Sequence, residues 1–77
     1  MSTTLNLIVV HIDESVDTAA LDNLEQGIRQ KHGVVSANHQ SNRNHLIVVG
    51  YDWELTRAAK VLHSFQERGL HVQLLGM

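Results

Sequence analysis

Two short runs of aliphatic, mostly β-branched residues constrain the fold of this chain more than any other feature. They are Leu7-Ile8-Val9-Val10 and Leu46-Ile47-Val48-Val49. Runs of this length and composition are typical of buried β-strands and are far too short to span a bilayer. The two runs therefore predict strands with apolar side chains on both faces, whereas a sheet with one solvated face would alternate with polar residues.

The segments around these runs predict the element order βαββαβ. Strands are expected where β-branched residues cluster or alternate, at residues 5–12, 34–40, 45–51 and 70–75. Helices are expected at 16–32 and 54–68, where apolar residues recur at helical spacing. Gly33 and Gly69 follow these two segments and are typical of helix ends. At the helix starts, we expect capping by Asp13, Glu14 and Asp17 for the first helix, and by Asp52 or Thr56 for the second.

This order predicts an α+β, ferredoxin-like fold. In that fold two helices cover one face of a four-stranded antiparallel sheet with the strand order 4-1-3-2. Residues 1–77 are expected to form a single domain, because the chain has no proline, no linker-like stretch and no internal repeat.

Composition narrows the classes of partner and of chemistry. The formal net charge of −2 gives no basic footprint for nucleic acid or for an anionic membrane, so neither is an expected partner. Cysteine is absent, which excludes a disulfide framework, a thiolate nucleophile and a soft thiolate metal site. The first residues have no positively charged leader pattern, so we expect a cytoplasmic location.

The spacing of several residues resembles the heavy-metal-associated domains of copper chaperones and metal-pumping ATPases. The matching positions extend over nearly the whole chain and are Leu21-x-x-Leu24-Glu25-x-x-Ile28, Gly33-Val34, Tyr51-Asp52 and Gly69. The resemblance implies the βαββαβ fold and common descent, and it leaves the ligand open.

The metal loop of that family is degenerate here. The family's C-x-x-C motif would align with Asp17-Thr18-Ala19-Ala20, and the methionine before it with Ser15. Two thiolates on one loop suit Cu(I), and Asp17 opposite the methyl group of Ala20 cannot replace them. Cuprous chaperone chemistry of the family's kind is therefore not expected.

Six histidines make imidazole the most informative polar group of the chain. The topology predicts that His11, His39, His45 and His71 gather at one pole, with His11 and His71 as cross-strand partners. Two or three neighbouring imidazoles would suit Zn²⁺, Cu²⁺ or Ni²⁺. The alternative is that these are ordinary polar residues at strand ends.

Strand alternation also predicts an apolar patch on the face of the sheet away from the helices. Its expected members are Leu7, Val9, Leu46, Val48 and Leu75. Exposed apolar patches usually mark an interaction surface, most simply that of a homodimer, or otherwise that of a partner protein. The alternatives are a register shifted by one residue and simple β-propensity.

These features favour a small non-enzymatic binding or interaction domain that acts through its open sheet face. The first alternative is binding or trafficking of a divalent metal through the clustered histidines. The second is a regulatory domain that senses a small molecule. An enzyme is the least favoured class, because no cofactor motif is present and a chain of this size encloses little volume.

Overall fold

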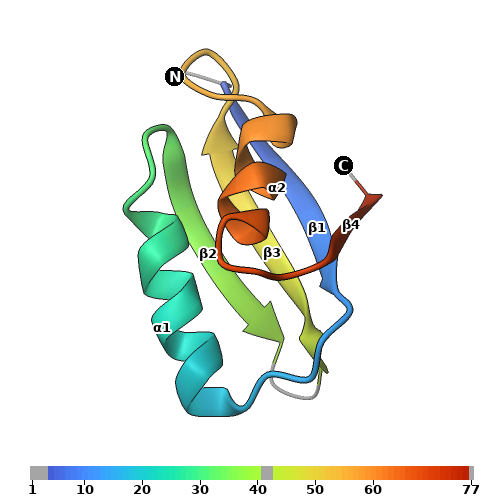
Figure 1. Ribbon diagram of the computed structural model, residues 1–77. Coiled ribbons are helices and arrows are strands. Elements are labelled where there is room, and N and C mark those ends of the chain that lie inside the picture. Colours follow the sequence, from blue (N-terminus) through green and yellow to red (C-terminus); the bar gives the residue numbers. More distant parts are fainter. Residues whose placement is uncertain (1–3, 41–42, 77) are drawn as a thin grey trace.

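A computed structural model describes residues 4–40 and 43–76 of the chain. In chain order these residues form β1 (Leu5–Ile12), α1 (Thr18–Arg29), β2 (Val34–Gln40), β3 (Arg43–Asp52), α2 (Ala58–Gln66) and β4 (Val72–Gly76). The strands make one sheet in the order β2-β3-β1-β4, and all neighbours are antiparallel. Both helices lie on the same face of that sheet (Figure 1). The predicted ferredoxin-like fold and strand order are confirmed.

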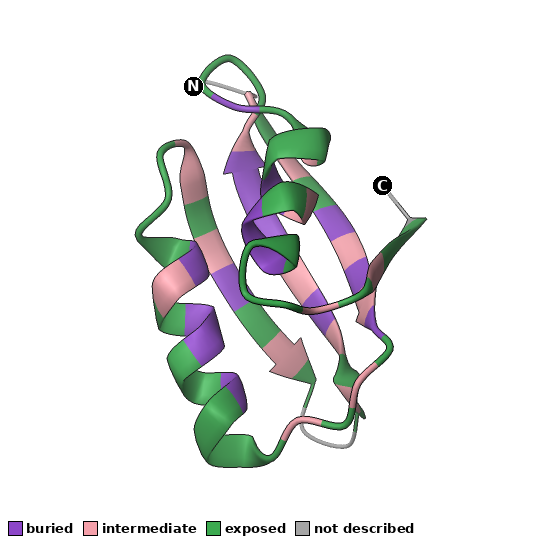
Figure 2. Ribbon diagram, in the orientation of Figure 1, coloured by how far each residue is buried: buried purple, intermediate pink, exposed green. Residues whose placement is uncertain are grey.

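The core lies between the helices and the inner face of the sheet. Alternate residues of the two central strands point into it, because side chains of a strand alternate between faces. The buried hydrophobic side chains are Ile8, Val10 and Ile12 of β1, Ala37 of β2, Ile47, Val49 and Tyr51 of β3, Leu21, Leu24 and Ile28 of α1, and Val61 and Phe65 of α2. Figure 2 shows these buried positions along the central strands and on the inner side of α1.

Both helices are shorter than the sequence predicted, and neither expected residue caps α2. Arg57 occupies the N-cap position and makes no side-chain capping bond. The Asp52 carboxylate instead accepts a hydrogen bond from the amide of Glu54 at 2.9 Å, and its carbonyl accepts from Leu55 and Thr56. Asp52 therefore closes a separate turn, and the helix begins only after that turn is complete.

Three irregularities interrupt the pairing of the edge strands, and one of them lies between His39 and Gln40 of β2. Pairing between β2 and β3 shifts between Val34 and Ser36, so Val34 and Ala37 can both pack on the core while Val35 is 63% exposed. The pairing of β1 with β4 shifts between Val9 and Val10. Bulges of this kind are typical of sheet edges, where they increase the local twist.

Among the described residues, no helix is long and apolar enough to cross a membrane. That the whole chain is one domain stays a prediction.

Gly33 brings the turn after α1 against the turn before α2. Its φ is 85°, and its carbonyl accepts the amide N–H of Asp52 at 2.8 Å. A Cβ at this position would lie 2.8 Å from Cγ2 of Thr56, which is closer than real Cβ contacts allow. Gly69 has a similar φ of 81° but has nothing within 4 Å of a Cβ.

We predict that Gly33→Ala lowers the free energy of unfolding by about 2–4 kcal/mol, because left-handed strain and overpacking add at this position. The matched control, Gly69→Ala, should lose only about 1 kcal/mol, because it carries the strain without the contact. Urea unfolding followed by circular dichroism measures both variants. Equal losses of unfolding free energy in the two variants would show that the contact with Thr56 does not add to the destabilisation.

Candidate functional site

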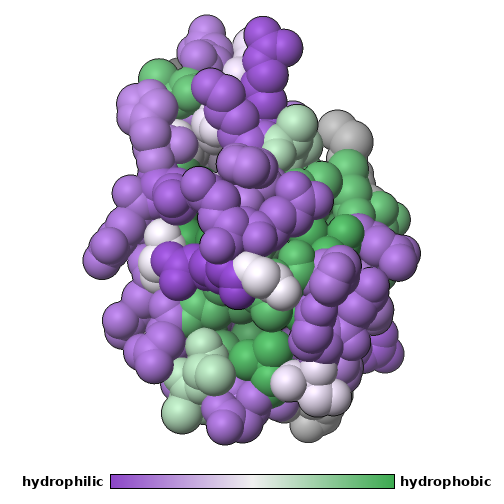
Figure 3. Space-filling model, viewed as in Figure 1, coloured by the Kyte–Doolittle hydropathy of each residue, from purple (hydrophilic) through white to green (hydrophobic). Residues whose placement is uncertain are grey.

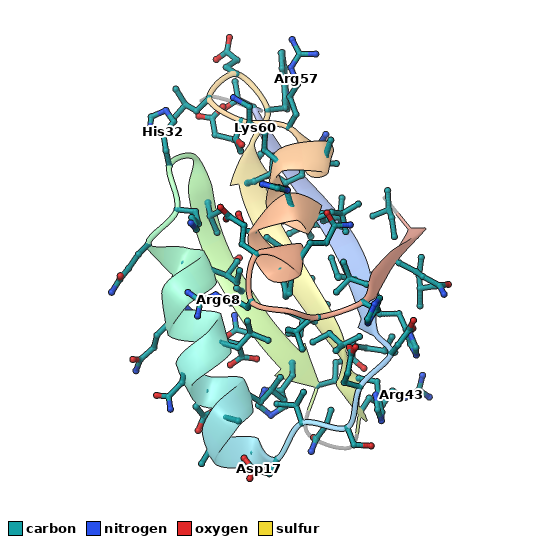
Figure 4. All side chains as sticks on the ribbon, in the orientation of Figure 1. Asp17, His32, Arg43, Arg57, Lys60 and Arg68 are labelled. Atoms are coloured by element: carbon teal, nitrogen blue, oxygen red, sulfur yellow. The ribbon has the colours of Figure 1, made fainter. Side chains whose placement is uncertain are left out.

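Residues 17–20, which align with the C-x-x-C motif of the heavy-metal-associated domains, form the beginning of α1. Asp17 is the N-cap of α1, and its Oδ1 accepts the amide N–H of Ala20 at 2.8 Å. Both side chains are exposed at the start of the helix, where Figure 4 shows Asp17. The Asp17 carboxylate is hydrogen-bonded to the backbone, and the side chain of Ala20 is only a methyl group. The capping predicted for Asp17 is confirmed. Asp17 and Ala20 cannot together provide two ligands for a metal ion, because alanine has no ligand atom.

Asp13 and Glu14 do not cap the helix as predicted, because each contacts a histidine instead. The carboxylate of Glu14 accepts both the backbone N–H of His71 at 2.9 Å and its ring Nδ1–H at 2.5 Å. This hydrogen bond, followed by the charge of Glu14, raises the pKa of His71 above its usual value of 6.5. The same bond is the main cause that lowers the pKa of Glu14 below 4.5.

A second pair of imidazoles lies at the ends of the central strands. The rings of His11 and His45 are stacked, with centroids 5.8 Å apart and planes at 19°. Nδ1 of His11 lies 3.2 Å from Oδ1 of Asp13, and Nδ1 of His45 lies 2.9 Å from the carbonyl oxygen of Ile12. Each ring therefore has a local partner through Nδ1.

The fourth histidine belongs to a cluster between α1 and the end of β2. Oε2 of the buried Glu25 accepts the backbone N–H of His39 at 2.5 Å and lies 2.7 Å from its Nδ1. Asp22 lies one turn before Glu25 on the exposed edge of the helix. Across residues 4–40 and 43–76, these three form the one group of His, Asp or Glu residues that brings three ligand atoms within 4.8 Å of one another.

The four predicted metal-binding histidines thus do not converge on one point. His39 lies on β2 and His71 directly precedes β4, which are the two edges of the sheet. Three strand spacings separate these edges by about 14 Å, which is too far for one shared ion. His11 lies opposite Gln73 and not opposite His71, so the expected cross-strand pair is wrong. The pair that sequence alternation missed is His11 with His45.

The open face of the sheet carries apolar side chains along its two central strands. Leu7 and Leu75 are 57% and 56% exposed, while Val9, Leu46 and Val48 are half-buried. Cross-strand register places Val9 opposite Val48 and Leu7 opposite Gly50. Leu5, 52% exposed, extends the set, and the alternation Leu5, Leu7, Val9 could have identified it. We call these six residues the open-face patch.

Replacing Glu14 with glutamine should show whether its carboxylate raises the pKa of His71. We predict that His71 titrates above pH 6.5 in the wild type and closer to 6.5 in Glu14→Gln, as followed by NMR of the imidazole protons. The raised pKa of His71 contributes stability that is lost as the pH rises through it. The lowered pKa of Glu14 contributes stability that is lost as the pH falls through it.

The stability difference between wild type and Glu14→Gln should therefore be largest between about pH 4.5 and 6.5. Because the His71 side chain is 81% exposed, salt should screen much of the effect. An identical titration of His71 in both proteins would contradict this assignment.

Comparison with known proteins gives structural likeness alone. No family model and no curated protein sequence matches the chain. A copper-binding domain of the P-type ATPase HMA7 aligns with a TM-score of 0.81 and 17% identity, over 91% of this chain and 93% of that one. A copper-bound variant of CopA from Bacillus subtilis aligns over the full length of both chains, with a TM-score of 0.78 and 23% identity.

Oxidized MerP from Ralstonia metallidurans CH34 aligns with a TM-score of 0.79 and 14% identity, over 91% of this chain and 96% of that one. The shared architecture extends over almost the whole of each protein, although few side chains are the same. The described part of this chain has the fold of the heavy-metal-associated domains, as its residue spacing predicted, and its sequence has no cysteine.

Proposed function

We propose that this chain is a non-enzymatic interaction domain that associates with a second copy of itself through the open-face patch. The observation that carries the proposal is the exposure of Leu5, Leu7 and Leu75 beside the half-buried Val9 and Val48. An antiparallel sheet with one solvated face normally alternates to polar residues on that face. Apolar side chains gathered on such a face favour a protein contact.

The surroundings of the patch favour a copy of the same chain as the partner. Neutral side chains flank it, with Ser36 and Asn38 on β2 and Gln73 on β4. A two-fold interface brings the same surface together twice, so a strongly charged surface would repel its own copy. These two lateral edges have no such penalty, while the charged Asp52, opposite Leu5, lies at one end of the patch.

A dimer that forms through this face should be weak. Four strands about 4.8 Å apart and a central strand of eight residues, each rising about 3.3 Å, give a footprint of about 500 Å². Standard stable interfaces bury about 800 Å² per partner. The association should therefore depend on concentration and not be permanent.

The loop chemistry is consistent with a role other than thiol-based metal transfer. Three of the solved structures with this fold are described as a copper-binding domain, copper-bound CopA and a copper chaperone. In this chain Asp17 caps a helix where a thiolate would be needed. A cytoplasmic location, with neither nucleic acid nor membrane as a partner, completes the proposal.

We predict that Leu7→Asp weakens self-association at least about tenfold, because each dimer would bury two carboxylates among apolar side chains. The matched control is Leu55→Asp, which alters a leucine of similar exposure, 51%, outside the patch. Sedimentation velocity across a range from micromolar to millimolar protein measures both. A wild type that stays monomeric throughout, or equal effects of the two variants, would refute the dimer.

A second candidate function is binding of a divalent cation by Asp22, Glu25 and His39. The observation that favours it is the approach of their ligand atoms to within 4.8 Å. Two carboxylate oxygens and one imidazole nitrogen suit Zn²⁺, Cu²⁺ or Ni²⁺ better than Cu(I). Arg29 lies 3.6 Å from Glu25, and its positive charge opposes a bound cation, which limits the affinity.

We predict that Zn²⁺ shifts the NMR signals of His39 and saturates near one equivalent, and that Asp22→Asn weakens binding at least roughly tenfold through loss of a ligand. Asp22 is exposed, so its exchange should leave the fold intact. His32→Gln, which alters an exposed histidine outside the cluster, is the control. Equal zinc affinity in wild type and Asp22→Asn would exclude this site without affecting the dimer proposal.

A further inference from the structure

A hollow of about 320 Å³ lies between the turn that follows α1 and the beginning of α2. Its lining residues are Lys31, His32, Val34, Leu55, Thr56, Lys60, Val61, His63 and Ser64. The volume lies at the small end of the range of about 300–1,000 Å³ found for small-molecule sites. The hollow is on the helix side of the sheet and shares no residue with the open-face patch.

Every ionisable residue that lines the hollow is basic, although the chain has a net charge of −2. Glu67 is close to two of them, since its carboxylate lies 3.4 Å from Nζ of Lys31 and 3.8 Å from Nε2 of His63. His32 and Lys60 have no ion-pair partner within the described part of the chain. Figure 4 shows both at the same end of the molecule, one from the turn after α1 and the other from α2.

The rest of the lining is mainly apolar. Val34 and Val61 pack on or belong to the core, and Leu55 is half exposed at the mouth. The hydroxyl of Ser64 already donates to the carbonyl of Lys60 at 3.0 Å, so it is not a free donor. Figure 3 shows mostly hydrophilic side chains on the end of the molecule where α2 begins.

The two walls of the hollow are held together. Gly33 accepts the amide N–H of Asp52 at 2.8 Å and lies against Thr56 with no room for a side chain. The turn after α1 and the turn before α2 therefore keep a fixed separation. A ligand entering the hollow would meet a formed site and would need little reorganisation, which favours binding.

We propose that this hollow binds a small amphipathic organic anion, with its carboxylate near Lys60 and His32 and its hydrocarbon part against Val34 and Leu55. A lining of basic and apolar side chains matches a ligand that carries one negative charge and a short apolar chain. The site is independent of the dimer and of the Asp22–Glu25–His39 cluster.

The experiment is a ¹H-¹⁵N NMR titration of the full chain with sodium hexanoate. Two comparison probes separate charge from apolar contact: 1-hexanol has the chain without the charge, and inorganic phosphate has charge without the chain. Lys60→Gln tests the cation at the rim, and Arg43→Gln removes the same charge at the opposite end of the molecule (Figure 4).

We expect saturable shifts of the Gly33, Thr56 and Val61 amides with hexanoate, and severalfold weaker binding of both comparison probes. Lys60→Gln should weaken hexanoate binding roughly two- to fivefold, as loss of one partly exposed ion pair predicts, and Arg43→Gln should not. Non-saturable shifts, equal binding of phosphate, or equal effects of the two variants would overturn the proposal. Shifts centred on Leu7 and Val48 would overturn it too, by placing hexanoate on the open-face patch.

Discussion

The burial of alternate residues of β1 and β3 under the two helices is the interaction on which the structure depends. Ile8, Val10, Ile47 and Val49 are fully buried, and both neighbouring strands pair onto these two central ones. The same strands carry aliphatic residues on the other face as well. Because the period of a strand is two, a continuous aliphatic run cannot avoid presenting apolar side chains on both faces. The core and the open-face patch are thus consequences of the same two runs.

Three of the histidines are paired with carboxylates. Glu14 holds His71, Asp13 contacts His11, and Glu25 holds His39. Each pair joins a carboxylate to a nearby imidazole, so the histidines have local partners that do not require a metal. Only the last pair has a further carboxylate, Asp22, close enough for a third ligand atom within the described residues.

The sequence predicted the fold well, because hydrophobic periodicity and glycine placement are local signals that the tertiary structure reinforces. It predicted the helix ends less well, because whether Asp52 caps a helix or closes a turn depends on how the chain leaves β3. The β1 and β3 members of the open-face patch followed from alternation alone, since these two strands pair without a bulge. The histidine contacts could not be predicted in this way. The orientation of a histidine ring depends on carboxylates that can be distant in the sequence, such as Glu14 for His71.

The sequence did not predict the basic hollow between α1 and α2, for a similar reason. Lys31 and His32 are separated from Lys60 and His63 by nearly thirty residues of chain, and only the close approach at Gly33 brings the two pairs together. No spacing rule links them.

The cap at Asp17 also limits how this loop can change. A cysteine in its place would remove the hydrogen bond to the Ala20 amide, at a cost of about 1 kcal/mol, and a single thiolate would not form a chelate. The second cysteine would be needed at the same time to give any benefit. A path that begins at Asp17 therefore passes through a less stable protein, and a path in either order passes through a protein with a single thiolate that cannot chelate a metal, so two coordinated changes separate this loop from a thiolate pair.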